Sequence, residues 1–198
     1  MLEYKSTLKA RAYLYLELKK ASALYLQGIG IEEIKKIAIE ENIFLSSSQN
    51  RIKEIASTVI ERIKVLDKWL LAKIVDGNIE TSKQLALFTI LKTDRLYFEF
   101  MQDVYREKYL LKDYLITDQD FTTFFQRKSE QNTQVASWQD YTLYKLKQVY
   151  KRILIEAGFA KRNKKNIEIT RVLMEKDVAD HIKNRGDQIY LQAMLGEA

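Results

Sequence analysis

The lysines and arginines of the segment 139–172 are the residues with the clearest chemical potential. The segment has nine basic and three acidic side chains, a difference of +6, which equals the formal net charge of the whole chain. The other residues therefore carry equal numbers of basic and acidic groups. Clustered cations bind polyanions by neutralising phosphates and releasing counterions, so this segment predicts a nucleic-acid contact.

A helix over 138–157 is expected to present the first of these cations. At about 100° per residue, its apolar residues gather on one face, which is the expected core face. The opposite face would carry hydrogen-bonding and cationic side chains, and an α-helix is narrow enough to enter the major groove of DNA. These outward residues are Tyr144, Lys145, Gln148, Lys151 and Arg152.

A basic hairpin is expected directly after this helix. Gly158 would end the helix in a left-handed conformation, and Ile167 and Ile169 alternate with polar residues as in a strand. The tip 162–166, RNKKN, contains two asparagines, which tolerate positive φ and suit a turn. A helix, a glycine and a basic hairpin in this order are typical of the winged-helix form of the helix-turn-helix.

This arrangement predicts a set of DNA-binding residues. Lys145 and Gln148 are the candidates for base edges in the groove. The alternative interpretations are a charged helix face that is only solvated, and a winged helix that docks proteins. The predicted phosphate contacts are Lys151, Arg152, Lys161, Arg162, Lys164, Lys165 and Arg171.

The composition predicts a mainly α protein. The 198 residues include no proline and only six glycines, whereas loop-rich and all-β folds need such turn residues. We expect a helical bundle over 1–114 and a winged-helix-like unit with a short β-hairpin over 115–198, with a loop within 113–137. The helices are expected at 6–27, 31–41, 47–75, 80–92, 94–112, 117–130, 138–157 and 175–195.

Several kinds of site are excluded by residue type. The chain has no cysteine and one histidine, His181, so we expect no metal site, no cofactor and no catalytic residue, and hence no enzyme and no small-molecule substrate. His181 is expected to serve packing or the surface. The longest stretch without charge, 21–31, is far shorter than the ~20 apolar residues of a membrane span. We therefore expect a cytoplasmic protein that does not enter a membrane.

Three further patterns have structural and functional interpretations. Helices 31–41 and 47–75 could form a second helix-turn-helix with 47–51 at its tip, although a plain helical hairpin is the simpler interpretation. The aromatic residues of 94–125 could stack on bases, but helical spacing favours the core. The acidic residues Glu99, Asp103 and Glu107, with Arg106 among them, are expected to form solvated ion pairs rather than a metal site.

Three segments resemble a known family. They are 21–66, beginning ASALYLQGIGIEEIKK; 87–128, which contains YFEFMQDVYREKYLLKDYLITDQDF; and 141–159, YTLYKLKQVYKRILIEAGF. In order and spacing they resemble the BrxA proteins of bacterial BREX phage-defence systems. The resemblance implies a small, helical, non-enzymatic accessory protein that binds double-stranded DNA beside other BREX proteins. The alternative is an adaptor that holds other defence subunits without binding DNA.

Overall fold

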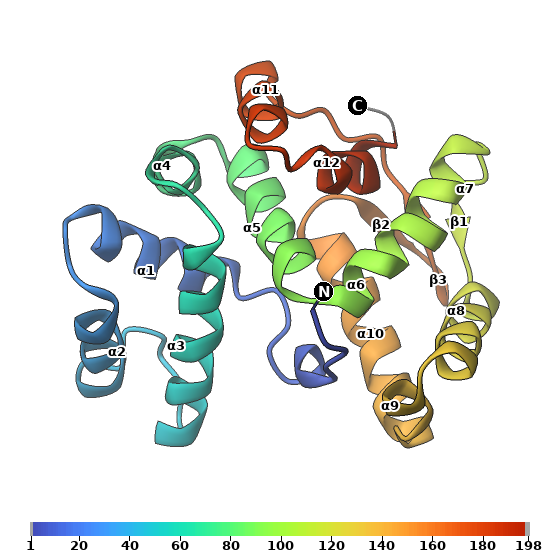
Figure 1. Ribbon diagram of the computed structural model, residues 1–198, viewed down its shortest axis with the longest axis horizontal. Coiled ribbons are helices and arrows are strands. Elements are labelled where there is room, and N and C mark those ends of the chain that lie inside the picture. The colour runs from blue at the N-terminus through green and yellow to red at the C-terminus, as the bar shows by residue number, and fades with distance from the viewer. Residues whose placement is uncertain (1, 197–198) are drawn as a thin grey trace. The chain divides into compact units, whose positions relative to one another are not determined.

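The computed structural model describes residues 2–196 and divides the chain into two compact units. Unit 1 comprises Met1–Ala12 and Asp94–Ala198, and unit 2 comprises Tyr13–Thr93. The chain is mainly α-helical with one small antiparallel sheet, as predicted (Figure 1). The predicted winged-helix-like segment 115–198 belongs to unit 1. Its independent folding, apart from 1–114, stays a prediction.

Unit 2 is a bundle of five helices. Helix α1 packs against α3 and α4, α2 packs against α3, and α4 packs against α5. The apolar stripe expected for 47–75 is buried along its whole length, from Ile52 to Ile74. The helices are α1 (Tyr15–Leu26), α2 (Ile31–Glu40), α3 (Gln49–Lys64), α4 (Lys68–Asp76) and α5 (Ile79–Thr93).

Two expected helices of the first 75 residues are shorter in the structure. The expected helix 47–75 is broken between α3 and α4, because the Asp67 carboxylate accepts from the Leu70 amide at 2.9 Å and caps a new helix. The expected helix 6–27 begins only at Tyr15. Its first residues form a short 3-10 helix, η1 (Thr7–Lys9), and Leu14 has a left-handed φ of 50°.

Unit 1 is built on a continuous helical rod from 95 to 110. The rod contains α6 (Arg95–Phe100), a π-helical segment η2 (Met101–Arg106) and α7 (Glu107–Leu110). Asp94 caps its start by accepting from the Tyr97 amide at 2.8 Å. The other helices of the unit are α8 (Asp118–Gln131), α9 (Thr133–Ala136), α10 (Asp140–Glu156), α11 (Lys176–Asn184) and α12 (Gln188–Leu195).

The core of unit 1 is aromatic. Phe100 stacks on Phe121 with ring centroids 4.9 Å apart, and Tyr150 lies 5.2 Å from Phe100. The core interpretation of the aromatic residues is therefore confirmed for these rings and for most of 94–125. Tyr114 is an exception, since it is 43% exposed.

A three-stranded antiparallel sheet in the order β1–β3–β2 completes unit 1. The predicted hairpin is β2 (Ala160–Asn163) and β3 (Asn166–Ile169), and β1 (Leu115–Ile116) pairs with β3. This short strand differs from the expectation of a loop within 113–137, because two residues are too few to show an alternating pattern.

Gly158 and Gly186 end helices in unit 1, and the sequence predicted only the first of these ends. Gly158 has φ of +85°, and the Phe159 amide donates to the Leu154 carbonyl at 2.8 Å, as expected of this helix end. Gly186, with φ of +78°, divides the expected helix 175–195 into α11 and α12. At the hairpin tip the positive φ falls on Lys164 (54°) and not on an asparagine.

Candidate nucleic-acid interface

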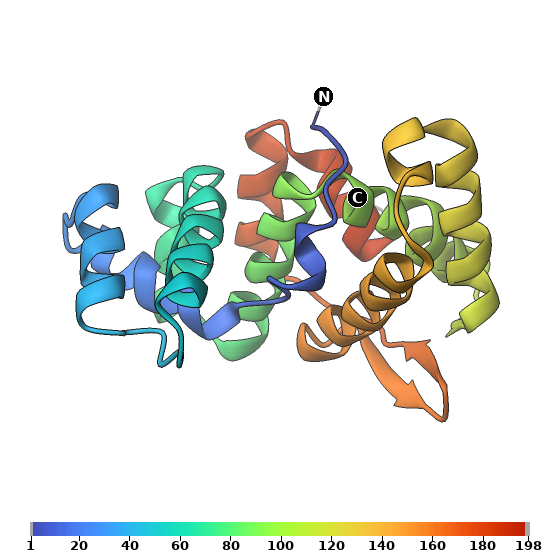
Figure 2. The ribbon, with the colours of Figure 1, turned by 90° about the horizontal axis from the view of Figure 1, so that it is seen from below.

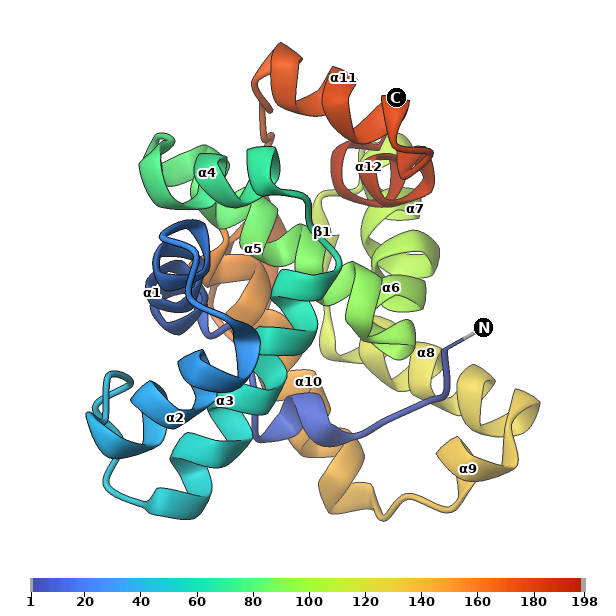
Figure 3. The ribbon, with the colours of Figure 1, turned by 60° about the vertical axis from the view of Figure 1, so that its left-hand side comes forward.

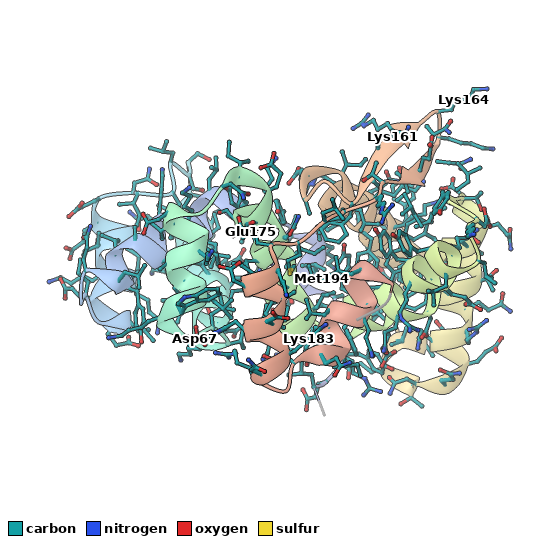
Figure 4. The ribbon with its side chains drawn as sticks, turned by 90° about the horizontal axis from the view of Figure 1, so that it is seen from above. Asp67, Lys161, Lys164, Glu175, Lys183 and Met194 are labelled. Carbon is teal, nitrogen blue, oxygen red and sulfur yellow. The ribbon has the colours of Figure 1, made fainter. Side chains whose placement is uncertain are left out.

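Helix α10 has the two faces that its sequence predicted. Leu146, Tyr150 and Ile153 are fully buried, whereas Lys145 and Gln148 are exposed. The hairpin β2–β3 projects away from the side of this helix (Figure 2), and Lys164 points outward from the hairpin tip (Figure 4).

A hollow of about 690 Å³, here named the basic groove, lies along α10 and the hairpin. Eight cationic side chains and a single acidic one, Asp118, line it. Such an excess of positive charge attracts polyanions. The cationic residues are Lys9, Lys145, Lys147, Lys151, Arg152, Arg162, Lys164 and Lys165.

The structure brings seven of the nine predicted site residues together in this groove, Gln148 being the one that is uncharged. Lys161 and Arg171 are not part of its lining. The Lys161 ammonium lies 3.1 Å from Glu168 Oε1 on the neighbouring strand, and Arg171 is exposed just after β3. The predicted DNA contacts of all nine residues remain predictions.

Lys151 differs from its expected position on the exposed face. The residue is only 9% exposed, because the first turn of α8 and the hairpin turn cover it. Its Nζ donates to Asp118 Oδ1 at 2.6 Å and to the Lys165 carbonyl at 2.9 Å. The hydrogen bond from Lys151, aided by the charge of Lys147, holds the pKa of Asp118 below its ordinary value.

Two groove cations were missed as site residues. Lys147 belongs to the basic segment and lies 3.5 Å from Asp118 Oδ1, so its position next to Gln148 was an available signal. Lys9 gave no signal in the sequence, since tertiary packing of η1 on α10 brings it to the groove. There its Nζ donates to Thr142 Oγ1 at 3.3 Å.

Exposed aromatic residues extend the outer face of α10. Tyr141 is 66% exposed and Tyr144 is 52% exposed. The Lys145 ammonium lies 5.2 Å from the centre of the Tyr141 ring, which is within cation–π range. The face therefore offers aromatic and amide groups as well as charge.

The alternative tip in unit 2 has little charge. Residues 47–50 are exposed at the start of α3, beside α2 (Figure 3), and Ser48 occupies the N-cap position without a side-chain capping bond. Arg51, its only cation, lies 3.4 Å from Glu54 Oε2. A second DNA contact at this tip stays a prediction.

Two acidic residues of the rod, Glu99 and Asp103, form ion pairs as expected, but these pairs are partly buried and not fully solvated. The Lys128 ammonium lies 2.7 Å from Glu99 Oε2 and 2.9 Å from Asp103 Oδ2, and this lysine is 7% exposed. Arg95 Nε donates to Glu99 Oε1 at 2.8 Å, and the Tyr4 hydroxyl also donates to this carboxylate. We name Tyr4, Arg95, Glu99, Asp103 and Lys128 the Lys128 cluster.

In this cluster, burial and ion pairing shift the pKa values of Glu99 and Lys128 in opposite directions. Desolvation raises the pKa of Glu99, but hydrogen bonds from Lys128, Arg95 and Tyr4 outweigh it and leave this pKa below its ordinary value. Desolvation lowers the pKa of Lys128, but Asp103 and Glu99 reverse this and leave that pKa raised. The ionised forms of Glu99 and Lys128 are therefore both favoured.

Among residues 2–196, no group of three potential metal-ligating side chains lies together. None of the helices described there is long and apolar enough to cross a membrane. His181 is half-buried in the last turn of α11.

Comparison with known proteins identifies the family. The BrxA family model matches residues 2–186. A BREX protein BrxA from Bacillus cereus is 51% identical over 194 residues, covering 98% of this chain and 97% of the relative. Another BREX protein BrxA, from Paramagnetospirillum magneticum, is 19% identical and covers 96% of both chains.

A solved structure supports the fold. The crystal structure of an uncharacterized protein from Magnetospirillum magneticum matches with a TM-score of 0.84 at 21% identity, covering 99% of this chain and 100% of that one. At this identity the likeness concerns the fold alone. The family match and the close relative together establish that this chain belongs to the BrxA family and is a component of a BREX phage-defence system.

Proposed function

We propose that this chain is a non-enzymatic protein that binds double-stranded DNA through the basic groove. The observation that carries the proposal is the charge of that groove, eight cationic side chains against one carboxylate. A surface of this kind would neutralise phosphates and release their counterions. The basic segment supplies the entire net charge of the chain, so the excess lies where the groove is.

The topology of unit 1 supports a winged-helix mode of binding. A helical rod is followed by β1, α8, α9, α10 and the hairpin, and the last strand of the hairpin pairs with β1. In helix-turn-helix proteins the recognition helix enters the major groove while neighbouring elements contact the backbone. By this analogy α10 is the recognition helix and β2–β3 is the wing.

Each exposed group of the groove has a role in this proposal. Lys145 and Gln148 on α10 face the base edges, where amide and ammonium groups donate to purine acceptors. Tyr144 extends the same stripe. The remaining cations contact phosphates and fix the register of the duplex. These are Lys9, Lys147, Arg152, Arg162, Lys164 and Lys165.

A salt titration of duplex binding tests the proposal. If about six cations contact phosphate, the affinity of the wild type should fall by roughly five decades for a tenfold rise in salt. The double variant Lys164→Glu/Lys165→Glu should bind at least about a hundredfold more weakly at low salt and show a shallower salt dependence. Both side chains are exposed, so the fold should persist.

A matched control separates the groove from the total charge. Lys176→Glu/Lys183→Glu makes the same change in net charge on exposed residues of α11 that are not part of the groove lining. Lys183 lies away from Lys164 at the hairpin tip (Figure 4). This control should bind DNA nearly as the wild type does. Equal losses in the two double variants would contradict a localised site. No gel shift by the wild type, together with retained capture of BREX partners, would instead support the adaptor function.

A further inference from the structure

We infer that Lys151 is a positioning residue, which holds the wing at a fixed place against the recognition helix, and is not itself a phosphate contact. This inference rests on the proposed function and assigns a separate task to one of its cations. Three elements meet at the Lys151 ammonium: α10, which carries it, the first turn of α8 and the turn of the hairpin.

The geometry leaves this lysine little capacity for a phosphate. An ammonium group has three donors. Two of them are directed at Asp118 Oδ1 (2.6 Å) and at the Lys165 carbonyl (2.9 Å), and the group lies 5.4 Å from the centre of the Phe121 ring. With 9% of the residue exposed, a phosphate oxygen would have to displace a carboxylate that is already in place.

The contact with the Lys165 carbonyl is the part that positions the wing. Lys164 and Lys165 are the only residues between β2 and β3, so a bond to this carbonyl fixes the backbone of the turn. The side chains of both residues start from that backbone. Their distance from Lys145 and Gln148 on α10 therefore depends on Lys151, although Lys151 contacts no base or phosphate in this scheme.

Asp118 compensates the charge of Lys151 and so allows this lysine to be largely buried. Without a partner, a largely buried ammonium would be costly. The Asp118 side chain is 47% exposed at the edge of the groove, where Lys147 lies 3.5 Å away. Lys151 thus lines the groove but serves to hold the hairpin turn and does not bind the duplex.

Salt titrations of two single variants test this assignment. Lys151→Met removes the ammonium but keeps an unbranched side chain of similar length. We expect its affinity for duplex DNA to fall about tenfold, with the slope of log affinity against log salt equal to that of the wild type. The control Lys147→Met also takes a cation from Asp118 but leaves the Lys165 carbonyl bonded, and its slope should become shallower by about 0.9.

Two results would overturn the inference. A slope in Lys151→Met that falls by about 0.9 would make Lys151 a direct phosphate contact, and unchanged affinity would remove its positioning role. If the wild type does not bind DNA, the proposed function fails, and hydrogen exchange then decides the inference alone. The amides of Asn166 and Ile167 should exchange about tenfold faster in Lys151→Met than in the wild type and Lys147→Met, and equal rates would refute it.

Should Lys151→Met not fold, the unaltered protein provides the test by lysine acetylation and mass spectrometry. Lys151 should react much more slowly than Lys145 and Lys164 in the free protein, and DNA should protect only the latter two. A Lys151 ammonium that reacts as fast as Lys164 and becomes protected by DNA would overturn the inference.

Discussion

Two largely buried lysines of unit 1 are placed in opposite electrostatic surroundings. Lys128 on α8 is 7% exposed and lies within 2.9 Å of two carboxylates, those of Glu99 and Asp103. Lys151 on α10 is 9% exposed and has one carboxylate, Asp118, and a backbone carbonyl. Both lysines are ion-paired, but their neighbourhoods differ in the sum of charge.

The difference separates a cluster whose charges are balanced from one whose charges are not. In the Lys128 cluster two cations, Arg95 and Lys128, face two carboxylates, so the charges are balanced and the cluster joins α6, η2 and α8. In the basic groove eight cations face one carboxylate. Unbalanced charge destabilises a fold by repulsion, and the proposed binding of DNA to the basic groove would offset this cost.

The largest effect on stability is expected at Lys128. Lys128→Met leaves Asp103 and Glu99 with an uncompensated negative charge in a partly buried place, and should lower the free energy of unfolding by about 3 kcal/mol. Urea denaturation measures this change. DNA affinity at a temperature where the variant is folded should stay that of the wild type.

Lys145→Met is the matched control, since it removes an exposed lysine of the groove. Its free energy of unfolding should change by less than about 0.5 kcal/mol, while its DNA affinity falls. The reverse pattern, a stable Lys128→Met and an unstable Lys145→Met, would contradict the distinction between a structural and a binding cluster.

The next effect concerns acid stability. The pKa of Glu99 is lowered in the folded chain, so its stabilising contribution is present above its ordinary value of 4.5 and is lost as pH falls through the folded-state pKa. In Glu99→Gln the loss of unfolding free energy between about pH 5 and pH 3 should be smaller than in the wild type. Asp113 and Asp118, whose pKa values are also lowered, should retain the remaining slope.

Denaturation series at several pH values measure this difference. The effect should be smaller than that of Lys128→Met, because protonation leaves the Asp103–Lys128 pair intact. Parallel curves for Glu99→Gln and the wild type would show that the cluster does not respond to acid in this range.

The sequence predicted most of the fold because its helices have clear apolar periods. The stripe from Ile52 to Ile74 and the two faces of α10 are both found as expected. Breaks between helices were harder to predict. Asp67 interrupts a helix without interrupting the apolar pattern, and Gly186 lies in the stretch 183–188, which contains no apolar side chain to mark a face. The strand β1 could not be found at all, because its pairing with β3 is a tertiary contact between residues more than fifty positions apart.

The candidate site was predictable where one helix carries it and unpredictable where elements meet. Lys145 and Gln148 follow from the helical face alone. Lys9 reaches the groove from the other end of unit 1's sequence, and Lys151 is covered by α8 and the hairpin. A helical projection gives the direction of a side chain but not what packs over it. It therefore could not distinguish a lysine that holds the hairpin from one that could contact DNA.

The opposite test is to remove the one acidic side chain of the groove, where the variants above remove cations. Asp118→Asn removes the carboxylate charge but keeps an oxygen that can accept from Lys151, so the turn of the hairpin should stay in place. Duplex binding should tighten about fourfold at low salt, since one like charge ~5 Å from a phosphate in water costs about 0.8 kcal/mol. High salt should reduce this gain. Weaker binding would mean that Asp118 orders the site more than it repels DNA. Fluorescence anisotropy with a labelled duplex resolves a change of this size.

The smallest effect is expected at Lys161, a basic residue of the hairpin whose charge is matched. Its ammonium lies 3.1 Å from Glu168 Oε1, its side chain is 61% exposed, and it is not part of the groove lining. Lys161→Ala should change the free energy of unfolding by less than about 0.5 kcal/mol and DNA affinity by less than about twofold. Lys164→Ala, one turn residue of the same hairpin, should weaken binding several times more. Equal losses at the two positions would mean that the hairpin attracts DNA by its total charge, and that the balance of charge around each lysine does not decide its role.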